Sequence, residues 1–161
     1  MDHLIETHDL EAQVIASIRD RCSQEAIPAL IKAAFAELFE HLGRHSVHPV
    51  GPPFVIYHEF GVGGVDAEVS VPIGERCEAD GRVACRVVPA MTVARILHVG
   101  PYERLGAAYA SLFGWIGSHG YRAAGPIQER YLNGPGDGIA TSAYRTEVEL
   151  PVMPLAVTAA V

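Results

Sequence analysis

Apolar residues recur at helical spacing in two segments of the chain, residues 27–43 and 103–117. The first stripe consists of Ile27, Ile31, Ala34, Phe35, Leu38 and Leu42, and the second of Leu105, Ala108, Tyr109, Leu112 and Ile116. Runs typical of β-strands precede each helix (13–21; 92–99), and two more follow it, separated by a turn (54–60 and 66–73; 127–132 and 145–152). The pattern predicts a β-α-β-β unit that occurs twice.

The two units are also similar in sequence. Residues 31–57 align with residues 105–131 without a gap, and the shared positions include Leu38/Leu112, Pro52/Pro126 and Tyr57/Tyr131. We therefore expect one domain over residues 1–161, with repeats at about 12–74 and about 88–153. Its predicted class is α+β, in which the duplicated units form a curved antiparallel sheet with both helices on one face.

Alternation along the strands predicts which face each side chain occupies. We expect Val69, Val71, Val148 and Leu150 to meet the helices, and Glu68, Ser70, Glu147 and Glu149 to point away. The same argument places Phe54 and Ile56 under the first helix and turns Val55, Tyr57, Glu59, Ile127, Glu129 and Tyr131 outward. The helix-free face would then carry tyrosines and glutamates from both halves, and it predicts a ligand groove there.

Charge and composition narrow the functional class. The 161 residues include 12 Lys and Arg against 19 Asp and Glu, a net charge of −7 that speaks against direct binding of nucleic acid. The apolar C-terminal segment 151–161 is too short to span a membrane, and it is consistent with a last strand and tail or with a contact in a homodimer. The N-terminus has no secretory signal, and Cys22, Cys77 and Cys85 lack a CxxC pair. We expect a cytoplasmic protein with free thiols.

Several ordered motifs resemble the GyrI-like effector-binding family. They are GPPFVIY (51–57), VARILHVGPYE (93–103) and TEVELPV (146–152), and the resemblance covers roughly residues 12–153. It implies the duplicated fold and a ligand groove between the two units. Many members also carry a DNA-binding domain, but the first repeat begins by about residue 13, so we expect a stand-alone member. Members of the family bind drugs or other amphipathic molecules, inhibit gyrase, or hydrolyse cyclopropane-containing natural products.

The resemblance singles out Glu147, which matches the acidic position of the family near the start of the last strand. Glu68 is its repeat mate, and Glu129 and Glu149 rank below both. The candidate aromatic walls, suited to stacking and cation–π contact, are Tyr57, Tyr102, Tyr131 and Trp115. The alternatives are that the glutamates are ordinary exposed strand residues and that the aromatic rings only pack in the core.

The leading hypothesis is a protein that binds an amphipathic, aromatic or cationic small molecule for drug or toxin resistance. One alternative is a hydrolase of reactive cyclopropane compounds with Glu147 as the catalytic acid or base. Another is a protein that modulates DNA gyrase. We expect no cofactor and no metal, since Gly43 and Pro49 interrupt the spacing of His41, His45 and His48. The Gly-rich segment 133–143 is predicted to be a mobile lid.

Overall fold

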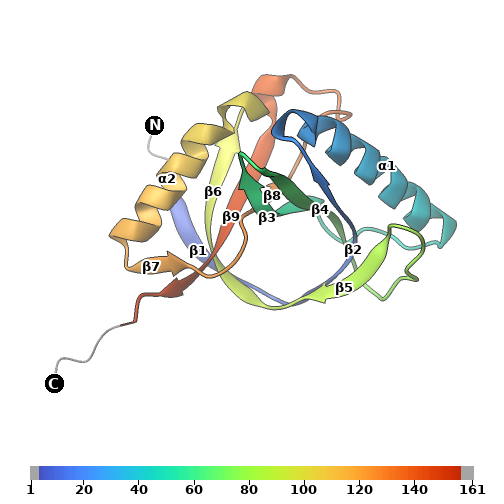
Figure 1. The fold of residues 1–161 in the computed structure, drawn as a ribbon, viewed down its shortest axis with the longest axis horizontal. Coiled ribbons are helices and arrows are strands. Elements are labelled where there is room, and N and C mark those ends of the chain that lie inside the picture. The colour runs from blue at the N-terminus through green and yellow to red at the C-terminus, as the bar shows by residue number, and fades with distance from the viewer. Residues whose placement is uncertain (1–3, 157–161) are drawn as a thin grey trace.

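The computed structural model describes residues 4–156 and contains two α-helices and nine β-strands within that range (Figure 1). The predicted domain ends at residues 1–3 and the end of the apolar C-terminal segment, residues 157–161, lie outside the described part. In chain order the elements are β1 (Ile5–Leu10), β2 (Gln13–Cys22), η1 (Gln24–Ala26), α1 (Ile27–Arg44), β3 (Phe54–Gly61), β4 (Gly64–Ile73), β5 (Ala84–Val88), β6 (Met91–Val99), η2 (Tyr102–Arg104), α2 (Leu105–Ser118), β7 (Tyr121–Ala123), β8 (Gln128–Tyr131), η3 (Thr141–Ala143) and β9 (Arg145–Pro154).

The strands form one antiparallel sheet in the order β1-β6-β9-β8-β3-β4-β2-β5, with the short β7 paired to the end of β9. Both helices lie on the same side of this sheet, which curls away from them into a half-barrel (Figure 1). The predicted α+β class, with a curved antiparallel sheet and two helices on one face, is confirmed. Neither helix in the described part of the chain is long and apolar enough to cross a lipid bilayer.

The outer strands of the sheet were not predicted. β1 pairs with β6, with Ile5 opposite Ile96, and β5 pairs with β2, with Val88 opposite Gln13. β1 precedes α1 in the chain but pairs with a strand of the second repeat, and β5 precedes α2 but pairs with a strand of the first. The polar run of β1 and the five residues of β5 give little periodic signal. The repeat boundaries remain a prediction.

Two apolar clusters hold the helices on the sheet. Under α1 the cluster includes Leu38 and Val71, and under α2 it includes Leu112 and Val148, all fully buried. Burying one such aliphatic side chain contributes about 1.5–3 kcal/mol. Pro28 lies in the first turn of α1, where its missing N–H loses no helical hydrogen bond. The predicted inward positions Val69, Val71, Val148 and Leu150 are confirmed.

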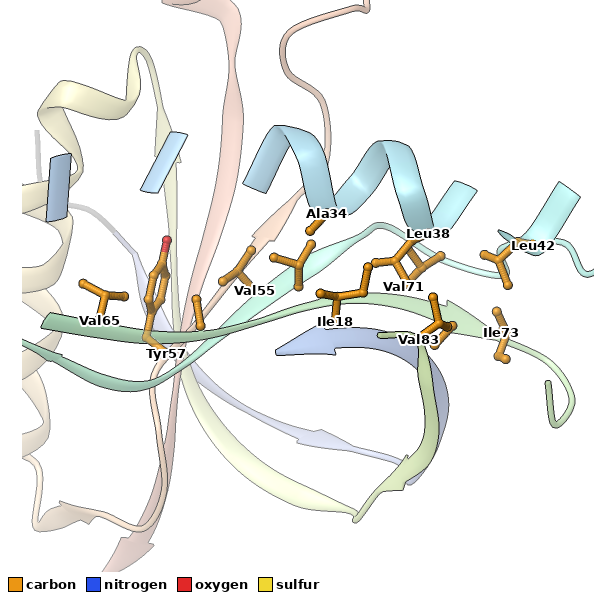
Figure 2. Close-up of a cluster of buried hydrophobic side chains, with 13 residues drawn as sticks. Ile18, Ala34, Leu38, Leu42, Val55, Tyr57, Val65, Val71, Ile73 and Val83 are labelled. Carbon is orange, nitrogen blue, oxygen red and sulfur yellow. The ribbon is translucent and has the colours of Figure 1, made fainter. Parts of the chain in front are cut away.

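The predicted orientation of β3 is wrong. Val55 and Tyr57 belong to the cluster under α1, where Figure 2 shows both on the helix side of the sheet. Phe54 and Ile56 instead pack on the opposite face, in a third cluster that includes Ile15. Both faces of β3 are therefore apolar and buried, so alternation did not identify the face that meets the helix. The second-half positions Ile127, Glu129 and Tyr131 also lie on the helix side.

The face without helices is closed by buried ion pairs as well as by the third cluster. Glu149 is fully buried and accepts hydrogen bonds from Nε of Arg95 at 2.9 Å, Nε of Arg130 at 3.1 Å and Nε2 of Gln128 at 3.0 Å. The Arg130 guanidinium lies 4.3 Å from the centre of the Phe54 ring. Glu149, which was expected to point into a groove on this face, is thus paired internally.

The expectation of free thiols is wrong for two of the three cysteines. Cys77, in the segment after β4, forms a disulfide with Cys85 of β5, and their Cα atoms are 5.8 Å apart. Cys22 is free. The pairing arises because β5 folds back alongside β2, a turn of the chain that the cysteine spacing did not reveal. The same segment is held against α1 by a 2.9 Å hydrogen bond between Nε2 of His41 and the carbonyl of Glu78.

Candidate ligand-binding site

Glu129 of β8 is a buried carboxylate surrounded by tyrosines. Glu129 is 7% exposed, and each of its two carboxylate oxygens accepts a hydrogen bond from a tyrosine hydroxyl. Tyr109 of α2 donates to Oε2, and Tyr131 donates to Oε1 at 2.9 Å. No Arg, Lys or His within residues 4–156 forms a salt bridge with this carboxylate. Glu129 is therefore a desolvated acid without a cationic partner.

The sheet places Glu129 between the two helices. Val55 of β3 lies opposite Glu129 in the register that joins the two halves, and Tyr57 lies two residues further along the same face of β3. Phe35 of α1 approaches from one side, with its ring 6.4 Å from that of Tyr131, while Tyr109 approaches from α2 on the other. The site thus draws one side chain from each helix and the others from the central strands β3 and β8.

Burial raises the pKa of Glu129, and this effect exceeds the opposing influence of the Tyr109 and Tyr131 hydroxyls and of nearby His98. Burial and the charge of Glu129 raise the pKa of Tyr131 and Tyr109 as well. A protonated or partly protonated carboxyl group costs less to bury than a charged one. When the group is ionised, its field is poorly screened at this depth, so it attracts a positive charge.

Aromatic rings surround the carboxylate and continue toward solvent. Tyr102 of η2 lies 5.8 Å from Tyr131 and 5.3 Å from Tyr144, measured between ring centres. Burial raises the pKa of Tyr102 to about 12, so its hydroxyl stays a neutral donor. Tyr102, Tyr109, Tyr131 and Tyr144 are all partly exposed. These rings form the boundary between Glu129 and the surrounding water.

Two further polar side chains lie on the same face. In the register of the sheet, Thr146 of β9 lies between Tyr131 of β8 and His98 of β6. Within the described chain, Oγ1 of Thr146 is the one buried side-chain polar atom that has no hydrogen-bond partner. His98 is buried, and its Nε2 bonds the carbonyl of Pro101 at 3.0 Å. The site therefore combines an acid, five phenols, an imidazole and an unpaired hydroxyl.

The Gly-rich segment predicted as a lid contacts one of these rings. A Cβ atom on Gly134 would lie 2.6 Å from the Tyr102 hydroxyl, so that hydroxyl occupies the space that only a glycine leaves open. The backbone N–H of Gly134 donates to the Asp137 carboxylate at 2.7 Å. The contact fits the predicted covering of the site by residues 133–143, while their mobility remains a prediction.

The structure separates the predicted site residues into two groups. Tyr57, Tyr102 and Tyr131 lie together around Glu129. Glu147 and Glu68 lie on the opposite face of the sheet. Trp115 lies nearly two helical turns from Tyr109 along α2 and stacks between two other rings, at 4.2 Å from His119 and 5.7 Å from Tyr121.

Both carboxylates of the opposite face already have cationic partners. Glu147 is 20% exposed at its side chain and forms a 3.2 Å ion pair with Nε of Arg95. Glu68 accepts hydrogen bonds from Arg86, Ser17 and His58. Burial raises the pKa of Glu68, but these three donors outweigh it and bring the value to about 2. A cationic ligand would have to compete with an internal arginine at either residue.

Sequence reasoning ranked Glu129 below Glu147 and did not consider Tyr109, His98 or Thr146 as ligand contacts. The deciding error was the face assigned to β3 and β8. A usable signal was present in the helical stripe, because Tyr109 is the one tyrosine in it and a buried tyrosine needs a hydrogen-bond partner. A carboxylate on the strand facing that stripe is the natural acceptor.

Comparison with known proteins agrees with this fold. The chain is similar to the C-terminal domain of EcmrR (TM-score 0.86, 21% identity, covering 96% of this chain and 100% of that one). It spans 58% of the EcmrR chain in the structure of an EcmrR–DNA complex, at the same TM-score and identity. It is also similar to SAV2435 bound to tetraphenylphosphonium (TM-score 0.66, 12% identity, 95% and 94% covered) and to a hydrolase from Listeria innocua (TM-score 0.66, 11% identity, 92% and 91% covered).

None of the curated proteins matches the chain significantly. The model of the GyrI-like small molecule binding domain, in contrast, matches residues 5–153, which cover both helices and all the described strands except the last residue of β9. The chain therefore belongs to the GyrI-like family of small-molecule binding domains.

Proposed function

We propose that this protein binds a lipophilic, aromatic organic cation, with Glu129 as its counter-ion and the surrounding tyrosines as its walls. One observation carries the proposal: Glu129 is buried among phenols and has no basic partner in the described chain. Burying an unpaired charge costs several kcal/mol, and a bound cation offsets that cost. A drug or toxin of this chemistry fits a role in resistance.

The walls suit such a ligand in two ways. Tyrosine rings attract a cation through the electron-rich ring face, and each contact contributes about 0.5–2 kcal/mol, depending on desolvation. The two hydrogen bonds from Tyr109 and Tyr131 fix the position of both carboxylate oxygens before the ligand arrives. The similar fold of SAV2435, a protein bound to tetraphenylphosphonium, supports tetraphenylphosphonium as the first probe.

Isothermal titration calorimetry with tetraphenylphosphonium tests the proposal. We expect saturable binding that Glu129→Gln weakens tenfold or more, since loss of one partner of a buried charge pair costs about 2–5 kcal/mol. Glu147→Gln is the matched control, because the substitution is identical and Glu147 lies on the opposite face. Binding that Glu147→Gln abolishes and Glu129→Gln leaves unchanged would support the site inferred from sequence instead.

Hydrolysis of a reactive ring is a second candidate for the same residues. The raised pKa of Glu129 suits a general acid, which contributes about 10²–10⁴-fold to a rate. Incubation with a cyclopropane-containing alkylator, followed by mass spectrometry, tests this function. Ring-opened product that forms with the wild type and not with Glu129→Gln would support it. Modulation of gyrase stays a prediction from sequence, to be checked in a supercoiling assay.

A further inference from the structure

Thr146 and His98 are two polar groups on the face of Glu129 whose hydrogen-bonding capacity is not fully used. They are nearest neighbours on the adjacent strands β9 and β6, in register with each other. Neither pairs with Glu129, and a ligand that is only a cation would need neither. Their unused hydrogen-bonding groups therefore indicate which further polar group a ligand would carry.

The Thr146 hydroxyl is unpaired at a position that is fully buried. A buried hydroxyl without a partner costs about 1–3 kcal/mol, and a valine of the same shape would avoid that cost. Such groups are uncommon in folded proteins, and the described part of this chain has one. The register places it beside Tyr131, which donates to Glu129, so it adjoins the candidate binding site.

The imidazole of His98 contributes an acceptor. Its Nε2 bonds the carbonyl of Pro101 at 3.0 Å, and a carbonyl oxygen can only accept. In the neutral ring Nε2 therefore carries the hydrogen, and Nδ1 keeps a lone pair. Among the described residues no group bonds Nδ1. The Nδ1 lone pair accepts a hydrogen bond, and the Thr146 hydroxyl can either donate or accept one, so the pair matches a hydroxyl or an amino group.

The sheet fixes the spacing of this pair from the carboxylate. Glu129 lies opposite Val148, and Thr146 is two residues before Val148, so Glu129 and Thr146 are diagonal neighbours on the same face. Such neighbours are about 7–8 Å apart in an antiparallel sheet. Tyr131 lies opposite Thr146 and beside Glu129, so a flat aromatic body spanning the two points would lie along its ring.

We infer that the preferred ligand carries, besides its positive charge, a hydroxyl or amino group several ångströms away, which Thr146 and His98 recognise. This inference rests on the proposed function and sharpens it: Glu129 supplies affinity for the cation, and the Thr146–His98 pair supplies specificity. A cation without a hydrogen-bonding group would bind, but it would leave both polar groups unpaired.

The test compares two probes by calorimetry: ethidium, an aromatic cation with two ring amino groups, and its analogue without them. The measured quantity is the ratio of their Kd values in the wild type and in Thr146→Val. We expect this ratio to favour ethidium and to fall about five- to tenfold in Thr146→Val, which is the range of one net hydrogen bond. Thr146→Ser, which keeps the hydroxyl, should preserve the ratio.

The outcomes separate the two proposals. An unchanged ratio in Thr146→Val, with both probes still dependent on Glu129, would overturn the specificity inference alone. No binding of either probe to the wild type would overturn the proposed function, and this inference with it. Thermal unfolding without ligand adds a check: Thr146→Val should raise Tm by about 2–4 °C. A lower Tm would show that the hydroxyl is bonded and would overturn the inference.

Discussion

Glu129 and Glu149 are buried carboxylates on opposite faces of one sheet, and they are neutralised in different ways. Glu149 accepts hydrogen bonds from Arg95, Arg130 and Gln128, whereas Glu129 accepts only from tyrosine hydroxyls among the described residues. The neighbouring strands β8 and β9 bring the two within one register step, since Gln128 lies opposite Glu149. One carboxylate is neutralised by internal arginines, and the other, under the proposed function, by a bound cation.

The same substitution should therefore have opposite effects on stability at the two positions. Glu149→Gln removes the counter-charge of two buried arginines and should lower the free energy of unfolding by about 3–5 kcal/mol. Glu129→Gln removes a charge without a partner and should leave stability unchanged or raise it. Urea unfolding followed by circular dichroism measures both, and equal losses would show that Glu129 is also needed for folding.

Binding of a cation should strengthen as pH rises. Burial raises the pKa of Glu129 above its ordinary value of 4.5, so near that raised pKa the ligand-free protein is partly protonated. A cation favours the ionised form, and binding should release a proton until pH exceeds the raised value. Calorimetry in buffers of different ionisation enthalpy counts the protons, and Glu129→Gln should release none.

The folding stability of the ligand-free protein should change with pH in the opposite direction from cation binding. A carboxyl group with a raised pKa in the folded state binds protons more tightly there than in the unfolded chain. Its contribution to stability is present below the unfolded value and is lost as pH rises through the folded one. Ligand-free wild type should thus lose more stability than Glu129→Gln over this range, and parallel profiles would contradict the raised pKa.

Reduction of the Cys77–Cys85 disulfide should destabilise the protein. The bond closes a short loop and, by loop entropy, contributes about 2–3 kcal/mol. For a chain of this size, dithiothreitol should lower Tm by roughly 5–10 °C. Cys77→Ser should show the lower Tm without reductant, while Cys22→Ser, the control, should still respond to it. A Tm that reductant leaves unchanged would contradict a stabilising bond.

Gly134→Ala should weaken cation binding without touching the carboxylate. The added methyl group would meet the Tyr102 hydroxyl at 2.6 Å and displace that ring. Tyr102→Phe removes the hydroxyl, so the double variant should regain part of the lost affinity. Gly106→Ala, where a Cβ would meet nothing within 4 Å, is the control. Additive losses in the double variant would show that the two residues act independently.

The orientation of an element could be predicted from sequence only where one of its faces is apolar and the other polar. Leu38, Val71 and Val148 belong to elements with a clear apolar face, and their burial under the helices was predictable. Phe54 and Val55 are both fully buried, so β3 offered no polar face from which to orient it. That ambiguity transferred Tyr57 and Glu129 to the wrong side.

The glutamates show a second limit. Glu147 and Glu129 look alike in sequence, and what distinguishes them is a neighbour supplied by a distant segment. Arg95 of β6 pairs with Glu147, while Tyr109 of α2 donates to Glu129. Pairing across the sheet depends on register, which a single sequence does not specify when both faces are buried.

The outer strands β1 and β5 each pair with a strand of the other repeat, so β1 cannot pair until β6 has been synthesised. β1 leaves the ribosome well before its partner β6, which ends only at Val99. Until then β1 remains a strand without a neighbour, a state in which an apolar sequence would invite association with other nascent chains. Its central residues, Glu6, Thr7, His8 and Asp9, are polar. The weak hydrophobic pattern made this strand hard to predict from sequence. The same pattern lowers its tendency to associate with other chains before β6 is available.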